Sequence, residues 1–352
     1  MTKAKSRRPK KVKKQRLLVL VHSDLVPPDS LEGHTEKEIL EWKTEYDVVT
    51  TLRSIGHEVQ CLGVSDDLGA VRKAIEELKP HVAFNLLEEF HGVALYDQHV
   101  VSYLELLRQP YTGCNPRGLM LSHDKALCKE ILSYHRILTP KFAVYPIGRS
   151  VKPTKRLTYP LVVKSVSEEA SLGISRASIV TSDEKLKDRV EFIHHNIKSD
   201  ALVEEYIEGR ELYVGILGNQ RLNTFPIWEL VFTKSNDRVP LIATAKVKWD
   251  QDYQEKLGVE THAALELPEG VEASVIKQCI RTYRELFLTG YARIDLRLAA
   301  DGKAYVLEAN PNPNLSRGED FAEAGKASGI SYEALLQRIV TLGCSYKAAW
   351  KS

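Results

Sequence analysis

The chain has 352 residues, of which 43% are hydrophobic and 27% are charged, and its formal net charge is +2. This length and composition predict two or three domains with large apolar cores, and exclude a disordered or collagen-like protein. No stretch approaches the roughly 20 apolar residues of a membrane span, and the five scattered cysteines lack C-x-x-C spacing. We therefore expect reduced thiols in a cytoplasmic protein.

The first 16 residues form a separate, basic segment. They contain nine Lys and Arg residues and no Asp or Glu, so the remaining chain is mildly acidic. We predict that residues 1–16 are a disordered tail. Such a tail can contact a polyanion weakly, and the alternative is a solvated leader without a specific partner. The apolar run that follows, 17–21, is shorter than the roughly 7–15 residues of a signal-peptide core.

Strand-like and helix-like patterns alternate over the next hundred residues. Apolar runs and amphipathic helical periods follow one another at 17–22, 35–55, 58–62, 66–78 and 82–87. This alternation is typical of parallel βαβ units, whose ligands bind beyond the carboxyl ends of the strands. The sequence therefore predicts an N-terminal α/β domain over residues 17–115.

Residues 110–125, PYTGCNPRGLMLSHDK, interrupt the alternation. Their prolines, glycines and asparagine predict a linker with turns. Beyond it the pattern gives two helices, at 125–134 and 184–195, and short strands, at 141–145, 160–165, 174–180 and 201–206. We predict a smaller α+β unit, the central subdomain, over residues 116–211.

Residues 212–346 are again rich in strands and are predicted to form a C-terminal α+β subdomain. Gly218-Asn219 and Asp301-Gly302 are typical hairpin turns, the second joining strands at 292–298 and 304–309. Residues 233–262 are polar and irregular over a length that is typical of a functional loop. Helices are expected at 272–288, 320–327 and 332–342.

Several common catalytic and nucleotide-binding motifs do not occur. The chain has no G-x-x-x-x-G-K-[ST], G-x-G-x-x-G, G-x-S-x-G or H-E-x-x-H. P-loop kinases, Rossmann dehydrogenases, α/β-hydrolases and zinc peptidases are therefore disfavoured.

The strongest chemical pattern lies on the hairpin around Asp301-Gly302. Arg293 and Asp295 are two apart on one strand, and Glu308 and Asn310 are two apart on the other, so each pair shares a face. Two carboxylates and an amide oxygen are ligands that Mg²⁺ prefers. The alternative is a set of surface charge pairs on a β-ribbon.

A second pattern concerns anion binding. Lys164 ends an apolar strand and is followed by SVSEEASLG, a segment that can fold over a ligand and offer Ser171 and backbone N–H groups to phosphate. Lys125 begins a helix, where the dipole also favours an anion. Each lysine alone is equally compatible with a solvated side chain.

A third pattern is Glu204-Glu205-Tyr206-Ile207, with Glu211 four residues further along. Backbone groups at a strand edge can read an adenine edge, and a carboxylate can accept from ribose hydroxyls. Alone, this pattern has little specificity.

In their order along the chain, these pieces resemble the ATP-grasp superfamily, and within it the D-alanine–D-alanine ligase-like enzymes. The resemblance covers residues 80–345 and rests on six segments: PYTG at 110–113, HDK at 123–125, YPLVVKS…SLG at 159–173, EEYIEGRELYV at 204–214, ARIDL at 292–296 and LEANPNP at 307–313. It implies an α/β, three-domain ATP-grasp fold with ATP between the central and C-terminal subdomains.

The resemblance also implies a reaction and a set of roles. ATP phosphorylates a carboxylate, and an amine attacks the acyl phosphate to form an amide or peptide bond. Lys125 and Lys164 would contact phosphate, and Ser171 and Gly173 would belong to a loop over it. Adenine would be lined by Glu204, Glu205, Tyr206 and Ile207, with Glu211 on the ribose.

The remaining implied roles concern the reacting groups. Lys246, or alternatively Lys248, resembles the loop lysine that reaches the transferred phosphoryl group. Asp295, Glu308 and Asn310 resemble the ligands of Mg²⁺, for which Mn²⁺ can substitute. Arg293 resembles the arginine that stabilises the tetrahedral intermediate. A homodimer is common among the relatives.

The sequence departs from the family pattern in both amino-acid subsites. The glycine-rich first turn is replaced by HSDLVPP at 22–28, which puts a D-alanine donor in doubt. Glu319 stands where the ligases have a serine that binds the carboxylate of the acceptor. Because like charges about 4 Å apart repel by roughly 1–4 kcal/mol, we expect an acceptor other than D-alanine, such as a cationic amine. The alternative is that Arg317 pairs with the substrate and reverses this preference.

Two readings from other classes are kept open. One is a non-catalytic, nucleotide-binding ATP-grasp scaffold that acts through partners. The other is a nucleic-acid-associated protein led by residues 1–16. The simultaneous presence of Lys164, Arg293, Asp295, Glu308 and Asn310 favours the ligase over the scaffold, and deletion of the tail would test the nucleic-acid interpretation.

Overall fold

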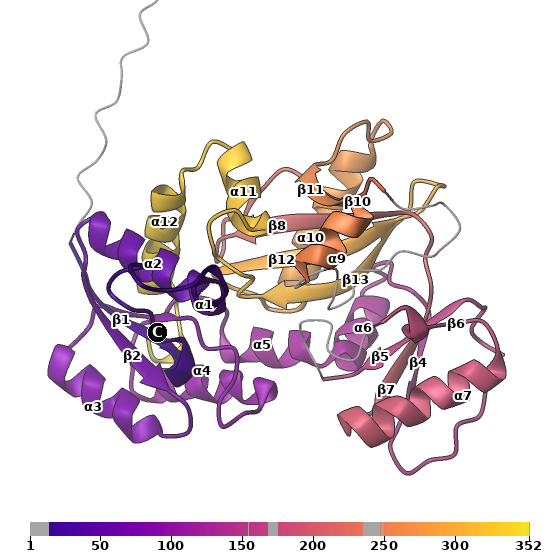
Figure 1. The fold of residues 1–352 in the computed structure, drawn as a ribbon, viewed down its shortest axis with the longest axis horizontal. Coiled ribbons are helices and arrows are strands. Elements are labelled where there is room, and N and C mark those ends of the chain that lie inside the picture. Colours follow the sequence, from indigo (N-terminus) through magenta and orange to yellow (C-terminus); the bar gives the residue numbers. More distant parts are fainter. Residues whose placement is uncertain (1–13, 154, 168–174, 235–246, 248–249, 352) are drawn as a thin grey trace, which may run out of the picture.

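The computed structural model describes residues 14–153, 155–167, 175–234, 247 and 250–351. Most of the basic tail, the segment with Ser171 and Gly173, and the loop with Lys246 and Lys248 lie outside the described residues. Figure 1 shows three lobes, with the N-terminal lobe and the central lobe at opposite ends and the C-terminal lobe between and above them.

The N-terminal lobe is built on a parallel sheet of order β2-β1-β3. Its strands are β1 (Arg16–His22), β2 (Glu58–Val64) and β3 (Val82–Asn85), and its helices are α1 (Glu36–Glu41), α2 (Lys43–Ser54), α3 (Leu68–Leu78) and α4 (Asp97–Leu106). The whole of β1 is apolar except at its ends, as expected for a strand covered on both faces. The expected parallel α/β arrangement is confirmed.

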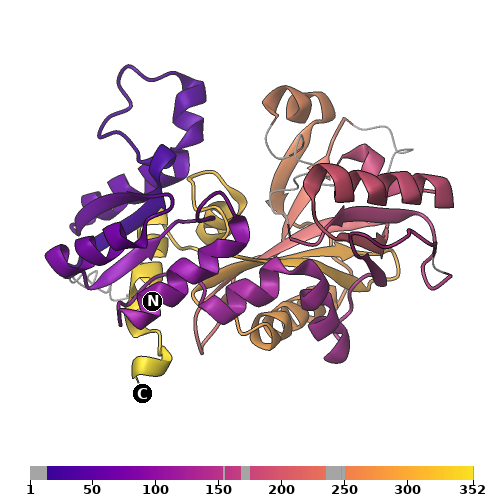
Figure 2. The ribbon, with the colours of Figure 1, turned by 90° about the horizontal axis from the view of Figure 1, so that it is seen from below.

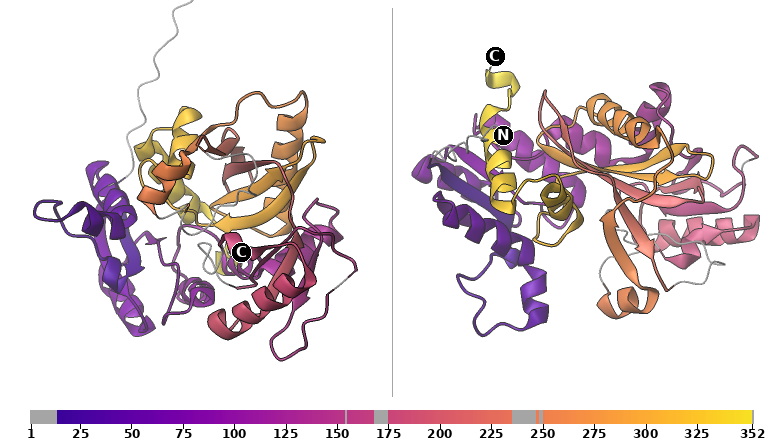
Figure 3. Two further views of the ribbon diagram at one scale, coloured as in Figure 1. Left: turned by 45° about the vertical axis from the view of Figure 1, so that its right-hand side comes forward. Right: turned by 90° about the horizontal axis from the view of Figure 1, so that it is seen from above.

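One face of this sheet is covered from the far end of the chain. Helix α12 (Tyr332–Ser345) packs against α2 and β3, and its apolar side chains join one core with those of β1 and α2. Figures 2 and 3 show α12, in yellow, beside the indigo N-terminal lobe. The boundaries at 115/116 and 211/212 stay predictions, and the N-terminal core draws on residues from both ends of the chain.

The central lobe has an antiparallel sheet of order β4-β7-β5-β6. Its strands are β4 (Phe142–Tyr145), β5 (Leu161–Ser165), β6 (Ile179–Val180) and β7 (Ala201–Glu205), and α7 (Asp183–Phe192) covers one face with Leu186 and Val190. Helices α5 (Pro116–His123) and α6 (Lys125–Tyr134) connect this lobe to the others. The expected strand at 174–180 is shorter, because residues 176–178 form a 3₁₀ turn before β6.

The C-terminal lobe has a six-stranded sheet of order β11-β10-β8-β12-β13, with β9 paired to β8. Its strands are β8 (Arg210–Leu217), β9 (Asn223–Thr224), β10 (Trp228–Phe232), β11 (Val259–Ala263), β12 (Tyr291–Leu298) and β13 (Ala304–Pro311). Its helices are α9 (Gln251–Leu257), α10 (Val271–Glu285) and α11 (Asp320–Ala327). The hairpin predicted around Asp301-Gly302 is confirmed as β12–β13.

Two local predictions are corrected by the structure. Residues 110–125 are not only a linker with turns, because 116–123 form α5: the Asn115 side chain accepts from the Gly118 N–H, and Pro116 occupies the first helical turn. The helix expected at 35–55 is two helices, which meet at Trp42, where φ is −119° and the helix is interrupted.

Within the described part of the chain, no helix has both the length and the apolarity needed to cross a bilayer. All five cysteines are free thiols, and three of them, Cys114, Cys128 and Cys279, are buried. The absence of disulfides in the structure agrees with the expectation from cysteine spacing.

A buried carboxylate lies on the apolar face of α2. Glu45 is 5% exposed and precedes Val48, Val49 and Leu52 on the helix stripe that faces the N-terminal core. Burial in these apolar surroundings raises the pKa of Glu45 from 4.5 to about 7. The folded protein therefore holds this proton over a pH range in which the unfolded chain has lost it.

Replacing Glu45 by Gln is expected to stabilise the protein at alkaline pH. Because the pKa of Glu45 is higher in the folded protein than in the unfolded chain, protonated Glu45 contributes stability at pH values below 4.5. This contribution is lost as the pH rises to about 7. At pH 8 the charge costs about 3 kcal/mol, which E45Q removes, whereas at pH 4.5 the variant gains little. Urea unfolding of both proteins at the two pH values measures this, and an equal difference at both would contradict it.

Candidate active site

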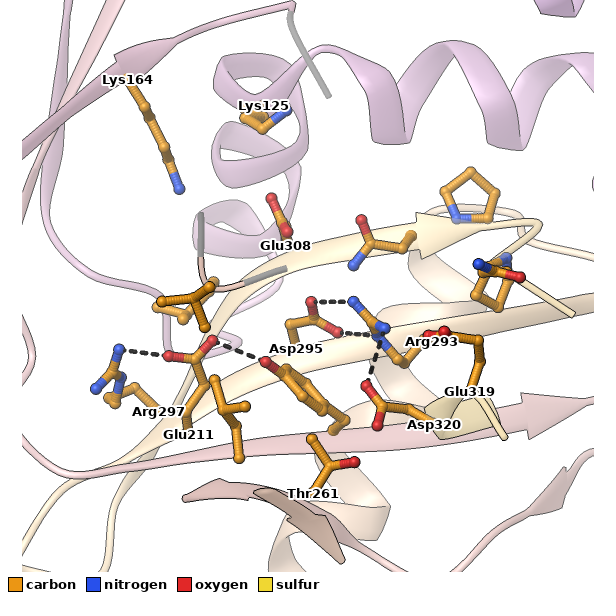
Figure 4. A pocket seen from close by; sticks show the side chains of 18 of the residues that line it. Lys125, Lys164, Glu211, Thr261, Arg293, Asp295, Arg297, Glu308, Glu319 and Asp320 are labelled. Atoms are coloured by element: carbon orange, nitrogen blue, oxygen red, sulfur yellow. Dashed lines mark hydrogen bonds and ion pairs between the residues drawn. The ribbon is translucent and has the colours of Figure 1, made fainter. Parts of the chain in front are cut away.

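The eleven described residues that the sequence singled out line a single cavity of about 490 Å³. They are Lys125, Lys164, Glu204, Glu205, Tyr206, Ile207, Glu211, Arg293, Asp295, Glu308 and Asn310. Figure 4 shows side chains from α6, β5 and the β8, β12 and β13 strands converging on this space. The structure therefore brings together residues up to 185 positions apart, from Lys125 to Asn310, at the junction of the lobes.

The β12–β13 hairpin places the carboxylates as the alternation predicted. Asp295 lies directly opposite Glu308, and Arg293 lies opposite Asn310, so all four side chains share one face of the ribbon. A bulge follows between Asp295 and Leu296. The surface-ribbon alternative is wrong, because Asp295 is 4% exposed and the face lines the cavity.

Arg293 is fixed by carboxylates on two sides. Its Nε and Nη2 donate to the two oxygens of Asp295 at 2.8 and 2.9 Å, and Nη1 lies 3.6 Å from Asp320. The guanidinium also stacks on Tyr213, 4.5 Å from the ring centre. Although burial opposes the charge, the pKa of Arg293 is raised by Asp295, so the group stays cationic. It is a pre-oriented donor at the cavity wall.

The donor set of Asp295, Glu308 and Asn310 fits a hard cation. Both carboxylates and the amide offer oxygen ligands on adjacent strands, which is the chemistry that Mg²⁺ selects. The Asn310 Nδ2 is buried and has no hydrogen-bond partner among the described residues. Turning this amide over puts its oxygen there, where a cation would satisfy it. Among the described residues, no group of three or more His, Cys, Asp or Glu side chains is arranged to hold a metal ion.

Lys164 belongs to a buried network of charged side chains. The sequence analysis singled out Lys164 and Glu204 but not the third member, Lys129. The Lys164 Nζ lies 2.7 Å from Glu204, whose other oxygen lies 2.8 Å from Lys129 Nζ. Lys129 also donates to Thr139, and Thr139 donates to the Val306 carbonyl on β13. The spacing of Lys125 and Lys129 on one helical face was the available signal for Lys129.

Protonation within this chain is set by burial and by neighbouring charges. Burial lowers the pKa of Lys129. Burial opposes the charge of Lys164 and of Glu204 too, but Glu204 and Glu308 raise the pKa of Lys164, and the two ammonium groups lower the pKa of Glu204. Glu204 is therefore a carboxylate that holds Lys164 toward the cavity.

Glu211 is held by Arg297 on the neighbouring strand β12 and by Tyr213 on its own strand β8. Arg297 Nη2 donates to Glu211 at 2.6 Å, and the Tyr213 hydroxyl donates at 3.0 Å. The same guanidinium lies 5.6 Å from the ring centre of Tyr206. Arg297 is 5% exposed and lines the cavity, yet it did not stand out in the sequence. This corner joins an aromatic ring, a carboxylate and an arginine.

Comparisons with known proteins identify the family of this chain. Residues 134–341, more than half of the chain, match the family model described as D-ala D-ala ligase C-terminus. A D-alanine–D-alanine ligase of Desulforudis audaxviator is 30% identical over 84% of this chain and 90% of its own. The chain belongs to the D-alanine–D-alanine ligase family. Proteins of this ATP-grasp family are ATP-dependent C–N ligases, and this chain is one of them.

Two further relatives place the family resemblance in context. An uncharacterized protein, y4sG, of Sinorhizobium fredii is 31% identical over 83% of this chain and 85% of its own. A crystal structure of the D-alanine–D-alanine ligase of Bacillus anthracis complexed with ATP has a TM-score of 0.72 and 23% identity, covering 94% of this chain and 97% of that one. The three-domain fold expected from the sequence is confirmed.

The segment after β13 lines one end of the cavity, and this end is acidic. The lining residues that it contributes are Asn312, Pro313, Asn314, Gly318, Glu319 and Asp320. Burial and the nearby Asp320 raise the pKa of Glu319. The positive charges of Lys43 and Arg293 act in the opposite direction and lower the pKa of Glu319 in part. Figure 4 shows Glu319 and Asp320 beside Arg293.

The PYTG segment supports that loop. The Asn312 Oδ1 accepts from the Cys114 N–H at 2.8 Å, and Asn312 itself has a positive φ of 52°. A Cβ on Gly113, whose φ is +91°, would stand 2.5 Å from that oxygen. Glycine is therefore needed at 113 both for the backbone conformation and for the close approach of Asn312.

A second buried pair that sequence reasoning missed is Asp97 with His123. The imidazole Nδ1 lies 3.4 Å from Asp97 Oδ1, and both side chains are at most 5% exposed although both line the cavity. His123 ends α5 and Asp97 begins α4. The HDK motif therefore brings two groups to the cavity, Lys125 and His123.

Proposed function

We propose that this ligase joins the carboxylate of one small substrate to the amine of another through an acyl phosphate formed from ATP. The observation that carries the proposal is the opposition of two lysines, Lys125 and Lys164, to the Asp295–Glu308 face within one cavity. Phosphoryl transfer to a carboxylate gathers several negative oxygens. A site for it must neutralise charge and fix positions, and it needs no nucleophilic side chain.

The nucleotide would lie between the β5–β7 sheet and the β8–β12–β13 sheet. Lys125 and Lys164 would contact its phosphates, and the Glu204–Ile207 segment would line the adenine with backbone groups, since the Glu204 side chain is held by lysines. Glu211 would accept from the ribose hydroxyls. Ser171, Gly173 and Lys246, or Lys248, would complete the phosphate contacts. Those four lie outside the described residues.

Asp295, Glu308 and Asn310 would hold Mg²⁺, or Mn²⁺ in its place. When bound there, the cation supplies charge neutralisation for the phosphate oxygens. Arg293, oriented by Asp295 and Asp320, would donate to the oxyanion that forms when the amine attacks the acyl carbon. The acyl–oxygen bond to phosphate then breaks, releasing inorganic phosphate, and the amine loses a proton.

The acceptor would be an amino acid or amine other than D-alanine, and a cationic one fits best. Nine carboxylates but only four Lys and Arg residues line the described cavity. At the loop end, Arg293 is the only Lys or Arg among the described lining residues, and it is already paired with Asp295 and Asp320. Lys43 does not line the cavity, although its charge acts on Glu319. The Glu319 carboxylate would repel the carboxylate of an amino-acid acceptor and attract a second positive charge.

The proposal includes a cytoplasmic location, which the free cysteines and the family support. Contact of the basic tail with a polyanion and a homodimer stay predictions from the sequence. Residues 1–13 lie outside the described part of the chain.

Phosphate release tests the proposed function. The purified protein would be incubated with ATP and Mg²⁺ and with D- and L-amino acids and diamines, singly and in pairs. We expect release that requires a carboxylate and an amine together, with a basic amino acid or diamine preferred over D-alanine as the acceptor. Efficient use of D-alanine in both positions would contradict the acceptor assignment. ATP binding without release under any pair would favour the non-catalytic scaffold.

A further inference from the structure

The loop that lines the acidic end of the cavity, residues 312–319, rests on a helix that does not line the cavity. Helix α2 lies in the N-terminal lobe, and Lys43, Thr44 and Asp47 of its first turns contact the loop across about 270 residues of sequence. Residues 312–314 and 318–319 line the cavity, whereas 315–317 do not. Of the loop residues that contact α2, Ser316 and Arg317 lie outside the lining, and Asn314 both contacts α2 and lines the cavity.

Thr44 closes a small hydrogen-bonded cluster with this loop. Its hydroxyl lies 2.6 Å from the Ser316 hydroxyl and 3.0 Å from the Asn314 Oδ1. The same Asn314 oxygen accepts from the Ser316 N–H at 2.8 Å. The cluster folds residues 314–316 into a fixed turn, since a short polar side chain that bonds the backbone two residues on is a turn-forming device.

The backbone of the next residue, Arg317, is held at its N–H and at its carbonyl by charged groups of α2. The Arg317 N–H donates to Asp47 Oδ2 at 2.9 Å, and the Arg317 carbonyl accepts from Lys43 Nζ. The Arg317 side chain donates to Thr51 on α2 and to Glu333 on α12. Its guanidinium also stacks on Tyr332. Gly318, with a φ of +88°, then turns the chain so that Glu319 faces the cavity.

We propose that Thr44 and Asp47 of α2 are positioning residues for the acceptor amine, which act by holding the 312–319 loop and, through it, Glu319. The inference rests on the proposed function for its substrate and on the hydrogen bonds above for its geometry. Recognition sites need their contacting groups held to within a fraction of an ångström by supporting residues. The N-terminal lobe thereby sets the acceptor subsite without contacting the acceptor.

Kinetics of four variants and a control test the role. Thr44→Val removes the hydrogen bonds to Asn314 and Ser316, and Asp47→Ala removes the one to the Arg317 N–H. Each variant is expected to raise the KM for the best amine of the panel about tenfold. The KM for ATP should stay within about twofold. Thr44→Ser and Asp47→Asn keep an oxygen in place and should restore most of the affinity. Thr50→Val is the control, because its hydroxyl bonds only Tyr46 and Asp47 carbonyls within α2.

Amide hydrogen exchange of the same proteins provides a readout that needs no substrate. Exchange in peptides covering residues 312–319 should quicken about tenfold or more in Thr44→Val and Asp47→Ala, and not in Thr50→Val. Unchanged exchange would overturn the inference, as would faster exchange with an unchanged KM for the amine. A wild-type protein that releases no phosphate with any pair would instead mark the failure of the proposed function, and exchange would still decide whether α2 holds the loop.

Discussion

Glu308→Gln is expected to lower the rate of ATP-dependent ligation at least a thousandfold while the protein stays folded. Glu308 lies opposite Asp295 on the β12–β13 ribbon and faces the lysine side of the cavity. The amide keeps the size of the side chain but removes one of the two negative charges that would hold the cation. Loss of a charge that helps to neutralise a phosphoryl group costs several kcal/mol, and each 1.36 kcal/mol is a factor of ten in rate.

The matched control for this change lies on the same hairpin. Asp301 is in the turn between β12 and β13, half exposed and paired with Lys303, outside the cavity. Asp301→Asn is the same chemical change and should leave the rate within about twofold. Phosphate release with the best substrate pair measures both, and thermal unfolding checks the fold. Normal turnover by Glu308→Gln would remove Glu308 from the proposed metal site.

The hairpin also shows what can be predicted from a sequence. Alternation along two strands and a compact Asp-Gly turn are local signals, and they were enough to pair Arg293 with Asp295 and Glu308 with Asn310 on shared faces of one hairpin, whose register the structure then supplies. The turn works because Gly302 adopts a φ of +80°. Features determined by neighbouring residues of the chain were therefore predicted from the sequence.

Features that depend on distant residues were missed. Lys129 on α6 pairs with Glu204 on β7, and Arg297 on β12 pairs with Glu211 on β8. Helical spacing marks the face on which Lys129 lies, but no local pattern shows which distant carboxylate pairs with either cation. The contacts of Thr44 with Asn314 and Ser316 span about 270 residues. Helix α5 was missed for a different reason. The pair Asn115-Pro116 is typical both of a turn and of the first residues of a helix. Packing of this segment against α4 and β13 favours the helix.

Arg293→Lys is expected to reduce the rate of ligation about 100- to 1,000-fold, although the positive charge is kept. The guanidinium grips both oxygens of Asp295 and reaches Asp320 while stacked on Tyr213, and a lysine cannot reproduce this planar, forked geometry. A misplaced donor would lose most of the stabilisation of the oxyanion, whose removal in other enzymes costs this much.

Arg210→Lys is the matched control, because Arg210 is also paired with a carboxylate but lies outside the cavity. Arg210 on β8 grips Glu229 with two nitrogens, but does not line the cavity. Arg210→Lys should leave the rate within about threefold, and ATP affinity measured by calorimetry should be unchanged in both variants, because Arg293 is assigned to the acyl group rather than to the nucleotide. If Arg293→Lys instead weakened ATP binding and kept the rate at saturation, Arg293 would belong to the nucleotide site, and the oxyanion would need another donor.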